Sequence, residues 1–195
     1  FDLLKEGRTN GVFQLESQGM KNVLHRLKPS HFEDVVAVNA LYRPGPMEYI
    51  PLYIDRKHGR KNIEYPHPDL KPILAHTFGV LVYQEQIMEV ARHVAGYSLG
   101  EADLLRRAVS KKQANVLEEE RMRFVQGCKA KGYDETIAHQ LFDWIVKFSN
   151  YGFNRSHAVA YSLISYRLAY MKAHYPSYFM AELMNAHLGD HEKMT

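Results

Sequence analysis

Apolar residues recur at intervals of three and four along almost the whole chain, a spacing that predicts amphipathic helices packed on a shared core. The run from Ser17 to Lys28 is a clear example, because its apolar side chains fall on one helical face and Pro29 ends it. Asp134 is expected to cap another helix with one buried face. Comparable patterns predict helices over residues 30–40, 49–57, 84–95, 114–131, 156–174 and 177–188, and from Ser98 through Arg107.

Short segments rich in glycine, proline or polar residues interrupt this pattern. Arg43-Pro-Gly-Pro46 breaks the chain sharply, and residues 60–72 read as a surface connection. Gly79–Tyr83 is the one short stretch with an extended pattern. The predicted fold is therefore mainly α, a multi-helix domain over residues 1–195 with at most a short extended segment near 79–83. Function is expected at the interruptions over 43–46, 96–100 and 150–157.

Two segments have the spacing of a capping box, in which a serine and a glutamate three residues later satisfy each other's backbone N–H groups. They are Ser30 with Glu33, and Ser98 with Glu101. The second box opens the helix that carries an arginine pair. Ser156 or Asn154 is expected to cap the helix that runs to His174.

The composition supports a cored domain, with 46% hydrophobic residues among 195. We read the chain, which begins at Phe1, as an excerpt of a larger protein. No run of about 18 apolar residues is present, so no membrane span or membrane partner is expected. Cys128 is the only cysteine, which excludes an intrachain disulfide and a cysteine-built zinc site and is compatible with the cytoplasm. Its place on an apolar helical side predicts a packing role.

A basic cluster, residues 106–112, stands out on a chain whose net charge is only +3. It holds four cations and no acid, and Arg107 and Lys111 are four residues apart, so they share a helical face. Arginine presents a planar fork to phosphate oxygens, which suits a nucleoside triphosphate. The alternative is a solvated basic face paired with the nearby glutamates, and composition alone favours it.

Two further segments combine polar or aromatic groups with a helix start. Tyr151–His157 places aromatics and a glycine beside backbone N–H groups that attract anions. Gly11–Ser17, with Gly19, is a candidate lining for a nucleic-acid groove. The alternatives are an interhelical turn with buried aromatics for the first, and a capped helix entry for the second.

Several chemistries find no pattern in this sequence. The eleven histidines have no metal-ligand spacing and no His-Glu-x-x-His occurs, so no metal site is predicted. Gly-x-Ser-x-Gly and a phosphate loop ending in Gly-Lys-Ser/Thr are also absent. No catalytic residue is therefore assigned within the chain.

Six segments in this order resemble the α subunit of bacterial DNA polymerase III, a C-family polymerase. The resemblance covers residues 1–187, nearly the whole chain, and implies the helical fingers domain that follows the palm. The segments are Val12–Lys21, Leu41–Pro46, Asp55–Gly59, Val82–Gln86, Ala102–Ala108 and Tyr151–His157.

The resemblance also implies roles for single residues. Arg106 and Arg107 match the pair that contacts the incoming triphosphate, and His157 matches the position near the nucleotide sugar. Val109-Ser110 replaces the family's Met-Gly before the lysines, and Arg155 stands where lysine is common. The residues expected to bind nucleotide are Arg106, Arg107, Lys111, Lys112, Tyr151, Gly152, Phe153, Asn154, Ser156 and His157, and those expected to contact DNA are Gln14, Ser17, Arg43 and Arg155.

The function implied by the resemblance is template-directed nucleotidyl transfer by a bacterial DNA-directed DNA polymerase during replication. Its partners would be dNTP and primer-template DNA, with the sliding clamp and other replicase subunits bound through segments not present here. Mg²⁺ would be held by palm aspartates that nothing in this chain matches. Two rival functions are a stand-alone helical nucleic-acid-binding module and a structural helical domain whose basic helix binds a protein.

Overall fold

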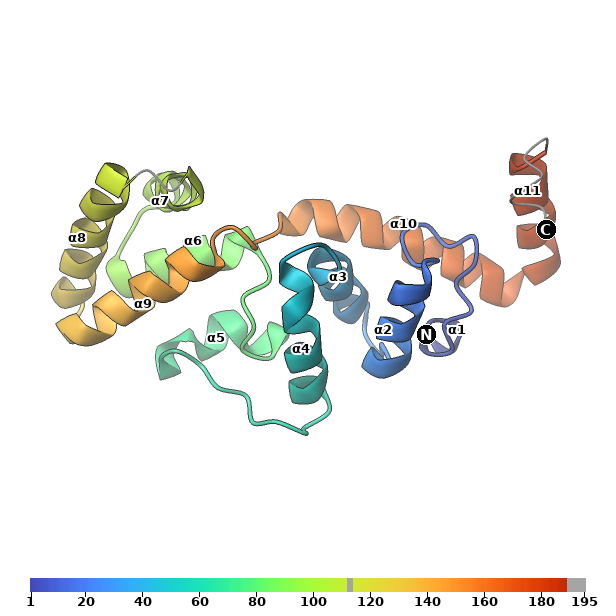
Figure 1. The fold of residues 1–195 in the computed structure, drawn as a ribbon, viewed down its shortest axis with the longest axis horizontal. Coiled ribbons are helices and arrows are strands. Elements are labelled where there is room, and N and C mark those ends of the chain that lie inside the picture. The colour runs from blue at the N-terminus through green and yellow to red at the C-terminus, as the bar shows by residue number, and fades with distance from the viewer. Residues whose placement is uncertain (112–113, 189–195) are drawn as a thin grey trace. The chain divides into compact units, whose positions relative to one another are not determined.

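The computed structural model describes residues 1–111 and 114–188, and this part of the chain is mainly α-helical (Figure 1). No strand occurs within these ranges; Tyr83 and Phe153 form one isolated parallel bridge. The predicted mainly α fold is confirmed. The helices are α1 (Asp2–Lys5), α2 (Gln18–Leu27), α3 (Phe32–Leu41), η1 (Pro46–Tyr49), α4 (Ile50–Lys57), η2 (Pro68–Leu70), α5 (Lys71–Leu74), η3 (Ala75–Thr77), α6 (Gln84–Ala95), α7 (Leu99–Lys111), α8 (Ala114–Ala130), α9 (Glu135–Phe148), α10 (Arg155–His174) and α11 (Pro176–Ala186), where η marks a 3-10 helix.

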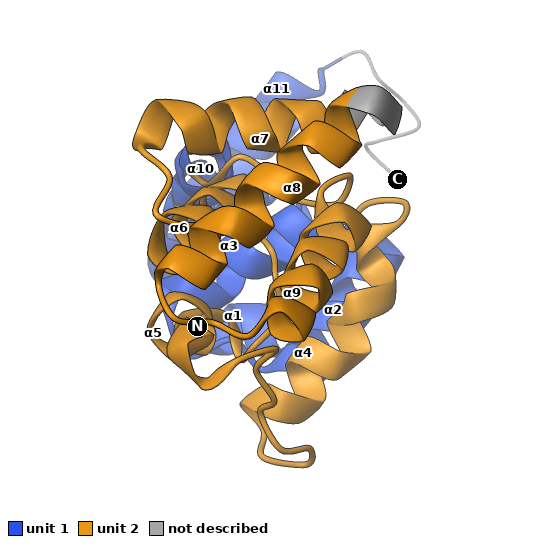
Figure 2. Cartoon of the chain, turned by 90° about the vertical axis from the view of Figure 1, so that its left-hand side faces the viewer, with its two compact units in different colours: residues 1–42, 156–195 blue, residues 43–155 orange. Residues whose placement is uncertain are grey.

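The chain forms two compact units, coloured separately in Figure 2. Unit 1 comprises Phe1–Tyr42 and Ser156–Thr195, and unit 2 comprises Arg43–Arg155. The unit boundary falls one residue inside α10, whose first residue, Arg155, belongs to unit 2.

Unit 2 is built around α6, α7, α8 and α9, which pack against one another. The rings of Phe124 on α8 and Phe142 on α9 lie 5.6 Å apart at the centre of this core. Each fully buried large apolar side chain contributes about 1.5–3 kcal/mol relative to an exposed one. Core members include Leu74, Ile87, Val90, Val94, Leu105, Cys128, Leu141 and Ile145, which places Cys128 in the packing role expected for it.

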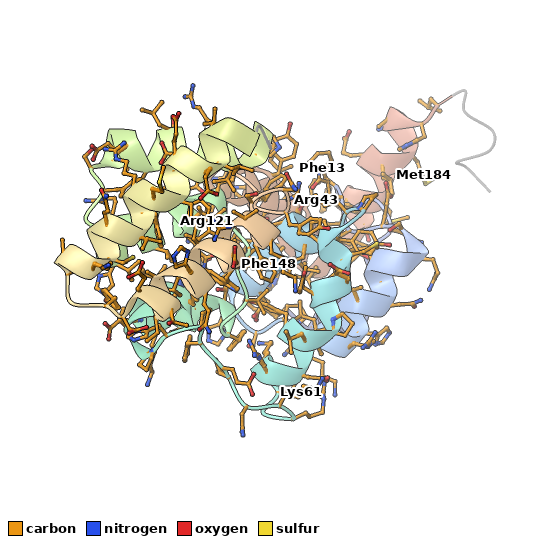
Figure 3. The ribbon with its side chains drawn as sticks, turned by 60° about the vertical axis from the view of Figure 1, so that its left-hand side comes forward. Phe13, Arg43, Lys61, Arg121, Phe148 and Met184 are labelled. Atoms are coloured by element: carbon orange, nitrogen blue, oxygen red, sulfur yellow. The ribbon has the colours of Figure 1, made fainter. Side chains whose placement is uncertain are left out.

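Unit 1 centres on α3, whose side chains are buried on almost every side from Val35 to Leu41. Asn39 is the polar exception, and its amide donates to the Ser162 hydroxyl of α10 at 2.8 Å. Ser165 of α10 donates to the backbone carbonyl of Phe13 at 2.8 Å. α10 is thus joined to α3 through the Asn39 side chain and to the segment before α2 through the Phe13 carbonyl. Met184 on α11 is exposed (Figure 3).

Three helix starts have the capping contacts that the sequence indicated. Ser17 caps α2 by accepting from Met20, and Asp134 caps α9 by accepting from Thr136. The Ser98–Glu101 box is present, with bonds of 2.7 and 3.3 Å.

The predicted Ser30–Glu33 box is wrong. Because α3 begins at Phe32, Asp34 occupies the third helical position. Its carboxylate accepts the backbone N–H groups of Ser30 and His31 at 2.9 and 3.1 Å. The pattern located the helix but shifted its start by one residue.

The extended segment before α6 fixes where that helix begins. Gly79 turns the chain at a φ of +75°, and a Cβ there would lie 2.5 Å from the carbonyl oxygen of Glu64. Buried Gln86 then accepts the backbone N–H groups of Val82 and Tyr83, both at 2.9 Å. The first turn of α6 is therefore held in one place. Within the described part of the chain, no helix is long and apolar enough to cross a membrane.

Candidate nucleotide-binding site

The basic pair on α7 is organised by a single carboxylate. Asp103 Oδ1 accepts from Arg106 Nε at 2.9 Å and from Arg106 Nη2 at 2.7 Å. Its other oxygen, Oδ2, lies 2.8 Å from Arg107 Nε. Asp103 precedes the two arginines by three and four residues, which is the spacing that reaches both on one helix. Hydrogen bonding from Arg106 lowers the pKa of the Asp103 carboxyl, so the bridge is ionised at neutral pH.

The two arginines differ in exposure and in their further contacts. The Arg106 side chain is 20% exposed, whereas that of Arg107 is 63% exposed. Arg106 Nη1 also donates to the side-chain oxygen of Gln84, the first residue of α6, at 3.3 Å. Arg106 therefore connects α7 to the start of α6, and Arg107 points a cation toward solvent.

Residues 149–154 form the loop between α9 and α10 and include Tyr151–Asn154 of the segment expected to line the pocket. This loop lies along the segment that leads into α6. Phe153 donates its backbone N–H to the carbonyl of Val82 at 2.9 Å and accepts from the N–H of Gln84 at 3.0 Å. Gly152 is buried, and a Cβ there would lie 3.2 Å from Gln84 Cγ. A larger residue here would push Gln84 away by a few tenths of an ångström. The loop and Arg106 meet at the same residue, Gln84.

Arg43, labelled in Figure 3, holds the other side of this loop. Its guanidinium donates to the carbonyl of Tyr151 and lies 4.8 Å from the ring centroid of Phe153. Burial lowers the pKa of this guanidinium. Gly45, at a φ of +95°, leaves room for Tyr151, because a Cβ there would lie 2.7 Å from Tyr151 Cε1. Arg43 is therefore engaged with the loop, and its predicted contact with DNA stays a prediction.

The backbone N–H at the start of α10 is bonded to a carboxylate of unit 2, that of Glu85. Glu85 accepts the backbone N–H of Arg155 at 3.1 and 3.0 Å and the side-chain amide of Asn154 at 3.0 Å. The Arg155 guanidinium lies 5.7 Å from the centroid of the Tyr83 ring. A carboxylate thus occupies the helix start that the sequence offered as one candidate site for an external anion.

The lysines of the basic cluster are described only in part. Lys111 is the last residue of α7, and its side chain, like all of Lys112, lies outside the described residues. Ser110, which stands where the family has glycine, donates its hydroxyl to the Arg106 carbonyl at 2.8 Å. The helix therefore continues through the position of this substitution.

Ser156 and His157 belong to unit 1, and both are exposed. The ring of His157 lies 4.1 Å from that of Tyr161, one turn further along α10. Because α10 begins at Arg155, Ser156 lies inside the helix, and of the two residues expected to cap it, Asn154 is the one that precedes it.

Ser17 and Gln14, the N-terminal residues expected to contact DNA, belong to unit 1, and each has a local role or conformation in the chain. Ser17 accepts the N–H of Met20 at 3.3 Å as the cap of α2, which is the alternative that the sequence left open. Gln14 is exposed and has a φ of +61°, a conformation uncommon for residues other than glycine. The predicted DNA contacts of both residues stay predictions.

The described residues do not fit a magnesium ion. Among residues 1–111 and 114–188, no three His, Cys, Asp or Glu side chains cluster as metal ligands. Asp103 and Glu85, the carboxylates of this site, are bonded to guanidinium and amide N–H groups.

Asp103, Gln84 and Glu85 shape the site but were not predicted as site residues. The spacing of Asp103 from the arginine pair was a sufficient signal, since such pairs interact on a helix. Gln84 and Glu85 had no spacing signal, because their partners Phe153 and Arg155 lie about 70 residues further along the chain. Their segment, Val82–Gln86, was marked only by the family resemblance.

The fold and these contacts define a helical domain with a cationic site beside a glycine-containing loop. The family described as the bacterial DNA polymerase III alpha subunit finger domain matches residues 1–132, and the chain belongs to this family.

Relatives named DNA polymerase III subunit alpha extend the similarity over the whole chain. The protein of Bacillus subtilis is 63% identical over 195 residues, which is 100% of this chain and 18% of the relative. The protein of Halalkalibacterium halodurans is 59% identical over 194 residues, 100% of this chain and 17% of the relative. That of Staphylococcus epidermidis is 57% identical over 193 residues, 99% of this chain and 18% of the relative. The chain therefore spans less than a fifth of the length of these relatives.

Proposed function

We propose that residues 1–195 supply the fingers of a DNA-directed DNA polymerase and bind the triphosphate of the incoming dNTP together with primer-template DNA. The observation that carries the proposal is the Arg106–Arg107 pair, held by Asp103 beside the 149–154 loop. Membership of the finger-domain family supports the assignment. The part of residues 1–195 beyond residue 132 is included because the relatives match it as well.

The chemical contribution of this chain is electrostatic. Arg106 and Arg107 neutralise charge on the β and γ phosphates, and this charge increases as the bond to the α phosphate breaks. Carboxylates outside this chain would hold Mg²⁺, which would supply activation of the primer hydroxyl and charge stabilisation of the pyrophosphate. A guanidinium fork suits this task because it binds two phosphate oxygens at once.

The 149–154 loop and the start of α10 are assigned to the base and sugar of the nucleotide. Because Glu85 already accepts the Arg155 N–H, the phosphates are assigned to the arginines and not to this helix start. Tyr151, Gly152, Phe153 and Asn154 line the base and sugar, with Ser156 beside them. His157 is assigned as the gate against ribonucleotides, on the strength of the resemblance alone.

The roles of the lysines, the DNA contacts and the partner proteins are assigned from the resemblance to the whole polymerase. Lys111 and Lys112 are placed near phosphate, and template-primer contacts are assigned to Gln14, Ser17, Arg43 and Arg155. The full-length protein would work in the bacterial cytoplasm with the sliding clamp and other replicase subunits, through segments that this chain does not contain.

A ternary-complex measurement tests the proposal in the full-length protein. A chain-terminated primer-template is saturated with enzyme, and the next correct dNTP is titrated while the half-life of the DNA complex is followed. The Arg106→Ala/Arg107→Ala double variant is expected to lose the stabilisation by dNTP, while Arg92→Ala, which removes an exposed cation from the same unit, keeps it. If the double variant retains full stabilisation, the triphosphate assignment is wrong.

A second arm of the same measurement addresses the rival in which α7 binds a protein. Phosphate contacts release counterions, so DNA binding through cations weakens steeply as salt rises. A salt-insensitive DNA complex would favour the protein-partner function.

A further inference from the structure

The guanidinium of Arg106 is held from two sides. Asp103 takes the Nε–Nη2 edge, and Gln84 takes one N–H of Nη1. A guanidinium has five N–H donors, and these contacts use three of them. Within the described part of the chain, no protein partner of the other two is observed, and 20% of the side chain is exposed.

Arg107 has a different environment. Its one ion pair is through Nε to Asp103 Oδ2, and 63% of its side chain is exposed. Exposed ion pairs of this kind contribute little to stability, so the pair exchanges readily for a more highly charged partner. A triphosphate carries several negative charges and is such a partner.

Asp103 can remain bonded to Arg106 when its ion pair with Arg107 breaks. The two arginines use different carboxylate oxygens, Oδ1 for Arg106 and Oδ2 for Arg107. Loss of the Oδ2 contact therefore leaves both hydrogen bonds from Arg106 in place. One carboxylate can hold one arginine rigidly and release the other.

Gln84 gives Arg106 a second hydrogen-bond partner, on α6. Its side-chain oxygen accepts from Arg106, and its backbone N–H donates to the Phe153 carbonyl. Gln84 therefore fixes the position of the Arg106 guanidinium relative to the loop that follows α9. Because the Gln84 amide is neutral, it orients the guanidinium without cancelling its charge for phosphate.

We infer that Asp103 and Gln84 are positioning residues that fix Arg106 for the nucleotide, while Arg107 exchanges its ion pair with Asp103 for the triphosphate. This division of labour rests on the proposed function, since it assumes that both arginines contact dNTP. Arg106 supplies orientation before binding, and Arg107 supplies charge on binding.

Single-turnover incorporation by the full-length polymerase, with the dNTP dissociation constant and the maximal rate measured separately, tests the inference. Gln84→Met removes the acceptor oxygen, keeps the side-chain length and leaves the backbone bond to Phe153 intact. The expected change is an increase of about tenfold in the dNTP dissociation constant, the equivalent of one hydrogen bond to a charged group.

A double-mutant cycle separates positioning from general damage. If Gln84 acts through Arg106, Gln84→Met has no further effect in an Arg106→Ala background, while in an Arg107→Ala background its full effect remains. An equal effect of Gln84→Met in all three backgrounds, or no effect in any, would overturn the inference.

Asp103 gives an independent test by conservative rescue. Asp103→Asn keeps an oxygen for Arg106, so its dNTP dissociation constant is expected to stay within about twofold of the parent, whereas Asp103→Ala raises it about tenfold. Equal losses in the two variants would contradict the positioning role. If Arg106→Ala and Arg107→Ala themselves leave dNTP binding unchanged, the proposed function fails; if they weaken it and the positioning variants do not, this inference alone fails.

Discussion

The carboxylate of Glu85 accepts the backbone N–H of Arg155 through both of its oxygens, at 3.1 and 3.0 Å. Glu85 lies in the first turn of α6, and Arg155 is the first residue of α10. Backbone N–H groups at a helix start attract anions, and here the anion is a side chain of the same chain. Glu85 thereby fixes the end of the loop that carries Phe153 and Asn154.

Removing this carboxylate should loosen the loop. In Glu85→Ala, the amides of residues 152–156 are expected to exchange with deuterium about tenfold faster, because one charge-assisted hydrogen bond no longer opposes local opening. Hydrogen-exchange mass spectrometry of the full-length protein measures this. Glu89→Ala, an exposed glutamate one turn later on α6, is the matched control and should leave the exchange of these amides unchanged.

Gly127 should be intolerant of a methyl group although it lies inside a helix. Alanine normally stabilises a helix interior by about 1 kcal/mol relative to glycine. At Gly127 of α8, however, a Cβ would lie 2.1 Å from the carbonyl oxygen of Ala95 on α6. Gly127→Ala is therefore expected to destabilise unit 2 by about 1–3 kcal/mol, as overpacked sites do.

The control for this prediction is Gly100 of α7, where a Cβ would meet nothing within 4 Å. Gly100→Ala should be neutral or stabilising by up to about 1 kcal/mol. Urea denaturation followed by limited proteolysis compares the two variants. Equal stability of both would mean that α6 and α8 do not pack closely at Gly127.

Cys128 should react slowly with thiol reagents in the native protein. Burial raises the pKa of its thiol to about 11. The neutral thiol therefore dominates the folded state until pH approaches that value, and only the thiolate is nucleophilic. At pH 8, labelling by iodoacetamide, read by mass spectrometry, is expected to be slow in buffer and fast in guanidinium chloride. Rapid labelling of native protein would contradict the buried position.

His157 should select the sugar if its assigned role is correct. Its ring contacts that of Tyr161 and the residue is exposed, so truncation is not expected to disturb the core. His157→Ala in the full-length enzyme is expected to raise the ratio of ribonucleotide to deoxyribonucleotide incorporation roughly tenfold, the scale of a lost steric contact. His93→Ala, another exposed histidine, is the control. A ratio at the parent level would remove His157 from the site.

The sequence predicted the helices well because their signals are local. Apolar spacing, Ser17, Asp134 and the Ser98–Glu101 box located helices that the structure confirms. The start of α3 was misplaced because two adjacent acids, Glu33 and Asp34, both suit a capping position, and the pattern does not distinguish them.

The candidate site was only partly predictable because its contacts join distant segments. Arg43 and Tyr151 are separated by 108 positions, and Glu85 and Arg155 by 70. The spacing of apolar residues along the chain gives no information about contacts between such distant residues. The basic pair was identified as a phosphate site by resemblance, while Asp103, which organises it, was visible in the spacing and overlooked.

The most direct test of the account is single-turnover dNTP incorporation by full-length Arg107→Ala beside Arg92→Ala. Both variants remove one exposed cation from unit 2. Arg107→Ala is expected to weaken dNTP binding and slow the chemical step, with a combined loss of roughly 10²-fold, as for other lost charge-stabilising donors. Arg92→Ala should match the parent. Unchanged dNTP binding and rate in Arg107→Ala, or equal losses in both variants, would contradict the account.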